Sequence, residues 1–360
     1  MVIGLLIALA VMALTTRTSA QEELLQGRSL DQSIRLPLTV TWSQASLRNR
    51  LQGFTRTQRI GLFLDRNVDP GRPVEITARD VTPPQFVWQL AEELELGATR
   101  VEDFYYLGPP ETVATLSLVV EQLAEETVKQ RRRHKVNWLA KAAWDTDPVV
   151  EPRILLEQLA ADAGVELVGL DEIPHDVWAG FRLPPTTLQT RFQILLQGFG
   201  KTFRRDKEGR RVAIIDLPTW DRAEREFTSD SAKEAGPKLK AALPGLGVEV
   251  RGKRLRVTGS PLQLLEAEAW LVAGETVAVE PTAETRFTLA TTAQRGSILA
   301  EVARQTKTKL VFLPHHQERL LARVTIDVDN VKVEDLFERV LEGTGLTAAI
   351  SDGQLTVSGD

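Results

Sequence analysis

Histidine and cysteine side chains carry much of the metal and acid–base chemistry of proteins, and this sequence is poor in both. It has four histidines and no cysteine among 360 residues. The lack of cysteine excludes disulfide bonds, thiolate metal sites and a cysteine nucleophile. The histidine pair His315-His316, with Glu318 nearby, lies in a predicted loop, where adjacent residues do not converge on one metal ion. We expect this pair to be solvated, with a metal site as the less favoured alternative, and we expect His134 and His175 at the surface.

Carboxylates are abundant, but their spacing is typical of solvated helix faces. A glycosidase needs two carboxyl groups that face each other across a cleft, and nothing in the spacing requires such a pair. We expect the following groups at the surface: Glu92, Glu93 and Glu95; Glu125 and Glu126; Glu266 and Glu268. The sequence therefore predicts no catalytic, cofactor-binding or metal-ligating residue. An envelope hydrolase with a cleft between domains is the enzyme alternative.

Positive charge is concentrated in one run, Arg131-Arg132-Arg133-His134-Lys135. Nucleic acid or anionic lipid could bind such a run. The formal net charge of −5 and the scatter of the other basic residues instead favour the solvated end of a helix. The turns Gly198-Phe199-Gly200 and Gly343-Thr344-Gly345 lack the Lys-Ser/Thr that follows a phosphate-binding loop. We predict neither a nucleic-acid partner nor a small-molecule substrate, and no cofactor.

The first residues predict export. Val2 to Leu14 is an unbroken run of 13 apolar residues, which is shorter than the roughly 20 that a transmembrane helix needs. Thr18-Ser19-Ala20 before Gln21 is an acceptable cleavage site, so 1–20 is predicted to be a signal peptide. No Lys or Arg precedes the apolar run, which leaves open that the segment stays uncleaved as an anchor.

Three stretches of the chain share one predicted order of elements, β-α-β-β-α-β-β. We call them the first repeat (34–108), the middle repeat (136–217) and the last repeat (284–358). The last repeat is the clearest, with strands at 286–290, 310–312, 323–328, 346–350 and 354–357 and helices at 297–303 and 333–341. Ser297 is its expected N-cap, and Asp352-Gly353 is a strong hairpin signal. In the middle repeat the first strand, between Val136 and Trp144, is the least defined.

A shared core register supports true repetition. The apolar residue before the second helix is Val81, Leu183 or Val331, and further apolar residues follow at fixed spacing: Phe86, Leu188 and Leu336 five positions later, and Leu90, Phe192 and Val340 nine positions later. Pro83-Pro84 and Pro184-Pro185 are both expected at helix starts, where proline is favoured.

The remaining stretches separate the repeats. A helical connector is predicted at 109–135. An inserted segment, 225–274, has a helix at 232–243 despite Pro237, a hairpin, and a second helix that Ser260-Pro261 opens. Trp220, in a linker, is expected to dock two modules, and the other tryptophans are expected in cores. The predicted fold class is α+β: small mixed-sheet modules in tandem plus one small α/β module.

These patterns carry a family resemblance. The three repeats resemble the secretin and TonB receptor short N-terminal domain. The best match runs from Arg323-Val324-Thr325-Ile326-Asp327-Val328 through Val331-Lys332-Val333-Glu334-Asp335-Leu336 to Leu341-Glu342-Gly343-Thr344-Gly345-Leu346. The inserted segment, with Arg254-Leu255-Arg256-Val257-Thr258-Gly259-Ser260-Pro261, resembles the KH-like ring-building domain of secretins. The chain lacks the long β-rich run that would form a pore or barrel in these families.

The resemblance implies a function in the cell envelope without enzymatic activity. We expect an exported protein of the periplasm or outer-membrane region that binds or assembles with other proteins. The partner would be a secretin-like pore, another outer-membrane complex such as that of a secretion system, or the chain itself. A membrane-anchored sensor or receptor is the alternative. The sequence does not indicate which residues bind the partner, so that site is unknown.

Overall fold

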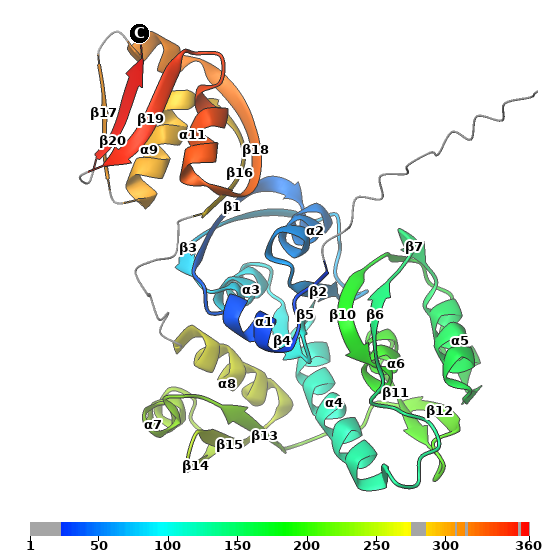
Figure 1. Ribbon diagram of the computed structural model, residues 1–360. Coiled ribbons are helices and arrows are strands. Elements are labelled where there is room, and N and C mark those ends of the chain that lie inside the picture. Colours follow the sequence, from blue (N-terminus) through cyan, green and yellow to red (C-terminus); the bar gives the residue numbers. More distant parts are fainter. Residues whose placement is uncertain (1–22, 275–285, 307, 314–315, 352–353, 360) are drawn as a thin grey trace, which may run out of the picture.

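A computed structural model describes residues 23–274, 286–306, 308–313, 316–351 and 354–359 (Figure 1). The predicted signal peptide, 1–20, lies outside the described residues, as does the turn at Asp352-Gly353. Within the described ranges, no helix is both long enough and apolar enough to cross a bilayer. Helices and several small mixed sheets occur side by side, which confirms the predicted α+β class.

The first repeat forms two small sheets. After a short helix α1 (Gly27–Ser33), its elements are β1 (Leu38–Ser46), α2 (Leu47–Gln58), β2 (Gly61–Leu64), β3 (Pro73–Val81), α3 (Pro83–Glu93), β4 (Gly97–Val101) and β5 (Phe104–Gly108). Strands β1 and β3 pair antiparallel. Strand β5 pairs with β2 in parallel and with β4 antiparallel.

The middle repeat has the same two kinds of sheet. Its elements are β6 (Lys141–Asp145), β7 (Val149–Val150), α5 (Pro152–Ala163), β8 (Glu166–Val168), the 3₁₀ turn η1 (Leu170–Glu172), β9 (Trp178–Ala179), β10 (Arg182–Thr187), α6 (Leu188–Gln197), β11 (Lys201–Arg205) and β12 (Arg211–Asp216). Strands β6 and β10 pair antiparallel, and β12 pairs with β8 in parallel and with β11 antiparallel. A short β7–β9 pair is an addition to the pattern.

The last repeat follows the same plan. Its elements are β16 (Arg286–Gln294), α9 (Arg295–Gln305), β17 (Lys309–Phe312), α10 (Gln317–Leu321), β18 (Arg323–Lys332), α11 (Val333–Leu341), β19 (Leu346–Ser351) and β20 (Gln354–Gly359). Strands β16 and β18 pair antiparallel, and β20 pairs with β17 in parallel and with β19 antiparallel. The first strand therefore pairs with the third in all three repeats. The expected N-cap Ser297 is wrong, because α9 begins two residues earlier and Gln294 occupies the cap position.

The start of the second helix differs from the sequence expectation in the middle repeat. Thr82 caps α3 and Thr187 caps α6, each accepting a hydrogen bond from the N–H three residues later. Pro83 and Pro84 do open α3, but Pro184 and Pro185 lie in β10, where the register to β6 shifts. Proline has no N–H for the ladder, so it is confined to edges and bulges of sheets. The placement of Pro184-Pro185 at a helix start is therefore wrong.

The observed start of α6 also changes which core positions of the middle repeat correspond to those of the first repeat. Counted from the helix caps, Val81 corresponds to Thr186 and not to Leu183, and Leu90 corresponds to Leu195 and not to Phe192. A helix that is slid by one turn still presents apolar residues at much the same spacing. Sequence periodicity alone could not separate the two registers.

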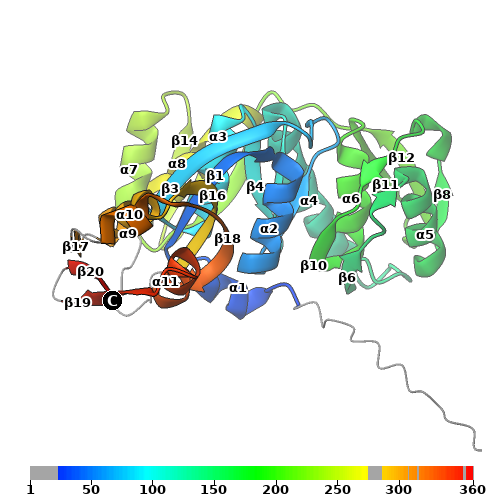
Figure 2. The same cartoon turned by 90° about the horizontal axis from the view of Figure 1, so that it is seen from above.

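The remaining elements lie around the first repeat (Figures 1 and 2). The connector is the long helix α4 (Pro110–Gln130). The inserted segment consists of β13 (Ala223–Thr228), α7 (Ala232–Ala242), β14 (Gly247–Arg251), β15 (Arg254–Gly259) and α8 (Pro261–Gly274), with strand order β13-β15-β14. The side chain of Ser260 accepts from the N–H of Gln263 at 3.3 Å, as expected for a cap, and Pro237 lies inside α7.

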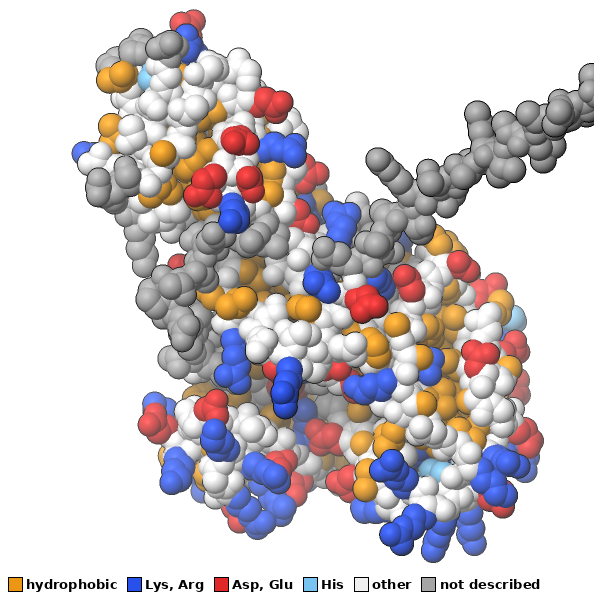
Figure 3. All heavy atoms as spheres, viewed as in Figure 1, with side chains coloured by type: hydrophobic (Ala, Val, Ile, Leu, Met, Phe, Trp, Pro, Cys, Tyr) orange, Lys and Arg blue, Asp and Glu red, His pale blue; other side chains and the backbone are white. Residues whose placement is uncertain are grey.

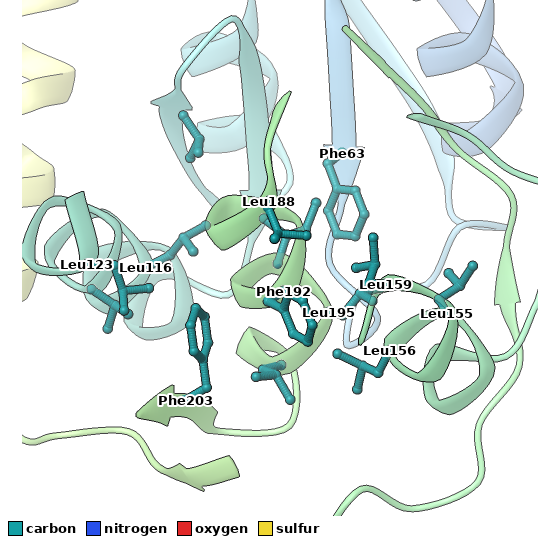
Figure 4. Close-up of a cluster of buried hydrophobic side chains, with 14 of the residues drawn as sticks. Phe63, Leu116, Leu123, Leu155, Leu156, Leu159, Leu188, Phe192, Leu195 and Phe203 are labelled. Atoms are coloured by element: carbon teal, nitrogen blue, oxygen red, sulfur yellow. The ribbon is translucent and has the colours of Figure 1, made fainter. Parts of the chain in front are cut away.

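One hydrophobic core crosses the boundaries between the first repeat, the connector and the middle repeat (Figure 4). It includes Phe63 from β2, Leu116 from α4, Leu156 from α5 and Phe192 from α6. The inserted segment has a core of its own, and Trp220 packs against both cores. The prediction that Trp220 docks two modules is therefore confirmed.

Candidate functional site

The basic run lies where the sequence predicts it. Helix α4 ends at Gln130, and Arg131, Arg132 and Arg133 after it are exposed. His134 is half-buried, and its Nε2 lies 3.1 Å from Oε1 of Gln130. Burial, with the positive charge of Arg205, lowers the pKa of His134, which favours the neutral ring.

Two polar residues that were expected at the surface are buried. His316 is fully buried, and its Nε2 lies 3.1 Å from the carbonyl oxygen of Gly359. Its neighbour His315 lies outside the described residues. Glu268 is 8% exposed, whereas Glu266, two residues earlier on the same helix, is exposed. The prediction of solvated side chains is therefore wrong for His316 and Glu268. In both cases, another part of the chain packs over the side chain.

A cleft of about 590 Å³ lies between the first and middle repeats. Helix α2 and strand β2 line one side, and residues 176–182 line the other. Pockets of this size between domains are common ligand sites. The cleft contains three aspartates, Asp65, Asp145 and Asp176, so it is the place to look for catalytic carboxylates.

The aspartates of the cleft are already held by other groups of the protein. Asp65 is buried and accepts from the hydroxyl of Tyr106 and from the N–H of Asn67 at 2.7 Å. Burial, then the negative charge of Asp65 and this hydrogen bond, raise the pKa of Tyr106 well above its usual value. Asp145 lies 3.7 Å from Nε of Arg182.

Asp176 joins the two walls of the cleft. Its Oδ2 accepts from Nε of Arg66 at 2.6 Å and from Nε1 of Trp178 at 2.8 Å. Burial acts to raise the pKa of Asp176, but these two bonds and one from the N–H of Val177 outweigh it, so the pKa is lowered. A carboxylate that three donors hold in the ionised form is suited to a structural ion pair and not to donating a proton.

The first and last repeats share one sheet, whose strand order is β18-β16-β1-β3 (Figure 1). Strands β1 and β16 are the first strands of their repeats, and they pair in parallel. The paired positions are Thr39 with Phe287, Val40 with Thr288, and Thr41 with Leu289. One repeat therefore adds its edge strand to the edge of another.

Polar contacts flank this shared sheet on both sides. On one side, Thr57 of α2 donates to Asp329 of β18, whose other carboxylate oxygen accepts from Thr288 at 3.1 Å. On the other side, Arg79 of β3 lies 2.7 Å from Glu301 of α9. Each repeat thus directs its first helix toward the outer strand of the other. This reciprocal arrangement is typical of a pseudo-two-fold pair of equivalent modules.

The inserted segment is joined to the first repeat through a buried ionic group. Glu268 of α8 accepts from Nη1 of Arg225 in β13 at 2.7 Å and from the hydroxyl of Thr99 in β4 at 2.9 Å. Glu121 of α4 lies 3.0 Å from Nε of Arg225. Burial opposes the charge of Arg225, but Glu268 and Glu121 outweigh it and raise its pKa. Buried charges persist only when they are paired in this way.

The first and middle repeats are also joined by polar side chains. Glu102, in the turn between β4 and β5, accepts from the hydroxyls of Thr187 and Thr190 at 2.5 and 2.6 Å. Lys141 of β6 lies 3.6 Å from the same carboxylate. Glu102 has a φ of 49°, and the turn directs its side chain to the start of α6. No spacing in the sequence marks this contact.

The described residues contain no group of three or more His, Cys, Asp or Glu side chains placed to hold a metal ion. In comparisons with known proteins, no family model matches the chain, and neither does any curated protein sequence. The most distinctive arrangement of the chain is the sheet shared by β1 and β16.

Proposed function

We propose that this chain is a non-catalytic, exported cell-envelope protein that binds or assembles with other proteins. The observation that carries the proposal is the parallel pairing of β1 with β16, in which one repeat extends the sheet of another. Strand addition supplies main-chain hydrogen bonds, which any extended partner strand can make, while side chains on alternate positions supply specificity.

The polar groups of the cleft support a binding role over a catalytic one. Asp65 and Asp176 are occupied by Tyr106 and Arg66, and the charge of Asp176 is stabilised in place, while Asp145 is 61% exposed and lies 3.7 Å from Nε of Arg182. An enzyme of the hydrolase class would need a carboxyl group free to exchange a proton with substrate. The resemblance of the repeats to periplasmic domains of secretins and TonB receptors, and the apolar run at 2–14, support export.

A membrane-anchored sensor or receptor is the second candidate. This candidate rests on the same apolar run of 13 residues, Val2 to Leu14. In such a protein the apolar start would remain as an anchor. The repeats would then pass a binding event to a membrane partner.

Cell fractionation with N-terminal sequencing, followed by photo-crosslinking at exposed strand edges in living cells, tests both candidates. We expect a chain that begins at Gln21 in the periplasmic fraction, with discrete crosslinks to envelope proteins. A membrane-bound chain that retains Val2 to Leu14 would replace the adaptor with the anchored sensor. A chain that stays in the cytoplasm and forms no discrete crosslink would contradict the proposal as a whole.

A further inference from the structure

The middle repeat has the same edge as the other two repeats, but this edge has no strand partner among the described residues. Strand β6 is the first strand of its repeat, as β1 and β16 are of theirs. Its sheet contains only β6 and β10, with β10 on one side of it. In the other two repeats the corresponding outer edges pair with each other.

The main-chain groups of β6 show which residues form the free edge. The N–H of Thr146 donates to the carbonyl of Phe181 at 3.1 Å, and the carbonyl of Ala140 accepts from the N–H of Leu188 at 3.0 Å. Even-numbered positions therefore face β10. Since the main-chain groups of successive residues alternate between the two sides of an antiparallel strand, those of 141, 143 and 145 point away from β10.

The surroundings of this edge are suited to a partner. Lys141, Ala142 and Ala143 are exposed, and both alanines are small enough for close approach. A groove of about 650 Å³ runs beside the end of the strand toward α5. Val149 and Ile154, which line the groove, are 65% and 44% exposed. Figure 3 shows hydrophobic side chains gathered over this part of the middle repeat.

We propose that β6 pairs in parallel with β6 of a second copy of this chain, as β1 pairs with β16. The inference rests on the proposed function and names one partner for it. The resulting sheet would have the order β10-β6-β6-β10, which matches β18-β16-β1-β3 in the same molecule. A paired edge also removes the aggregation hazard of an exposed strand.

Charge does not prevent this arrangement. Two identical edges pair in parallel only with a shift of one residue, as in β1–β16, where Phe287 lies opposite Thr39 and not opposite its equivalent Leu38. Lys141 and Asp145 therefore lie opposite neighbours of their equivalents, so like charges are not directly opposed.

Each charge is already compensated within its own chain, because Lys141 lies 3.3 Å from Asp103 and Asp145 lies 3.7 Å from Arg182. The apolar side chains beside the strand are then covered by the partner.

The test uses the absence of cysteine from the chain, which makes any introduced cysteine unique. The full chain is purified from the cells that express it, as wild type and as single variants Ala142→Cys, Ala143→Cys and Ala349→Cys. Ala349 is the matched control, since it is an exposed alanine on another edge strand, β19. Sedimentation equilibrium gives the mass of the wild type, and copper phenanthroline oxidises paired thiols to a disulfide.

We expect a wild-type mass twice that of one chain, disulfide dimers from a mixture of the Ala142→Cys and Ala143→Cys chains, and at least tenfold less from either variant alone or from Ala349→Cys, because only residues opposite each other share a face of the sheet. Efficient crosslinking of the Ala143→Cys variant alone would overturn the parallel pairing, because parallel pairing places the two side chains at 143 on opposite faces of the shared sheet. A monomeric wild type, or equal crosslinking at 349, would overturn the inference. It would leave the proposed function standing, because that function is tested by crosslinks to envelope partners in cells.

A strand-blocking variant separates edge pairing from other modes of dimerisation. Ala143→Pro removes an N–H that points away from β10, so it leaves the β6–β10 ladder in place. We expect this variant to sediment as a monomer with an unchanged circular dichroism spectrum. A folded Ala143→Pro variant that remains dimeric would show that the copies meet elsewhere. If this variant does not fold, the cysteine pairs still decide the question.

Discussion

The first repeat contacts its two partner repeats in two different ways. Toward the middle repeat it shares a hydrophobic core in which Phe63 lies between Tyr106, Trp178 and Phe181. Among the described residues, it meets the last repeat mainly at sheet edges, with a few flanking polar contacts. Most folding free energy comes from buried apolar surface, whereas exposed polar contacts contribute little.

We therefore expect the junction with the middle repeat to be permanent and the junction with the last repeat to be exchangeable. The first and middle repeats with α4 have one core, so we expect them to unfold together. The last repeat has a core of its own, and its docking depends on strand pairing. The strand edge is thus the surface at which we propose that this protein gains or loses a partner.

The largest expected effect is at the shared core. Phe63 is 2% exposed, and Phe63→Ala should destabilise the protein by about 3–5 kcal/mol, because it leaves a cavity between the first and middle repeats. Urea unfolding, followed by circular dichroism, measures the loss. Phe312→Ala, at a phenylalanine that is 39% exposed in the last repeat, is the control and should cost much less. Equal losses of stability in the two variants would show that the shared core around Phe63 contributes no more than an exposed site.

The next effect concerns the buried ionic group. Glu268→Gln should cost about 3 kcal/mol, since Arg225 then keeps only the partly exposed Glu121 as its partner. Glu266→Gln on the exposed side of α8 should change stability by no more than about 0.5 kcal/mol. Thermal unfolding compares the two. A similar small change in both variants would mean that the inserted segment is not joined through Glu268.

The third effect depends on pH and is specific to the core junction. The folded-state pKa of Asp176 is lowered, so its contribution is present at neutral pH and is lost as pH falls below about 4. We expect the difference in melting temperature between wild type and Asp176→Asn to shrink between pH 5 and 3. A difference that stays constant over this range would contradict the role of the Arg66–Asp176 pair.

The smallest effect is at the shared sheet. Arg79 and Glu301 are 35% and 38% exposed, so a double-mutant cycle of Arg79→Ala and Glu301→Gln should give about 0.2–1 kcal/mol. Limited proteolysis of the last repeat gives the readout, and the coupling should weaken at high salt. A coupling of several kcal/mol would show that side chains, and not strand edges, hold the last repeat in place.

Much of the architecture could be predicted from local sequence. The shared element order of the three repeats, and the two helices and the hairpin of the inserted segment, follow from alternation, helical spacing and capping residues, but strand β13 was not predicted. The errors in the middle repeat share one cause, because helical periodicity does not fix the position of a residue along the helix. Pro184-Pro185 and the register of α6 were therefore assigned one turn away from their observed places.

The residues of the candidate site could not be predicted from local sequence. Glu268 and Glu266 have the same chemistry and lie two residues apart on one helix, yet only Glu268 meets Arg225 and Thr99. Neighbours from distant segments decide burial, and a single sequence does not state which segments meet. The same holds for Asp176 and Glu102, whose partners come from other repeats.

The sequence by itself determined the elements, their repetition and the lack of cysteine chemistry, because these depend on neighbouring residues and composition. Only the tertiary structure decided that β1 meets β16 while β6 keeps a free edge. All three strands present the same main-chain donors and acceptors, so their side chains do not encode the pairing. The packing of whole repeats selects which edges come together.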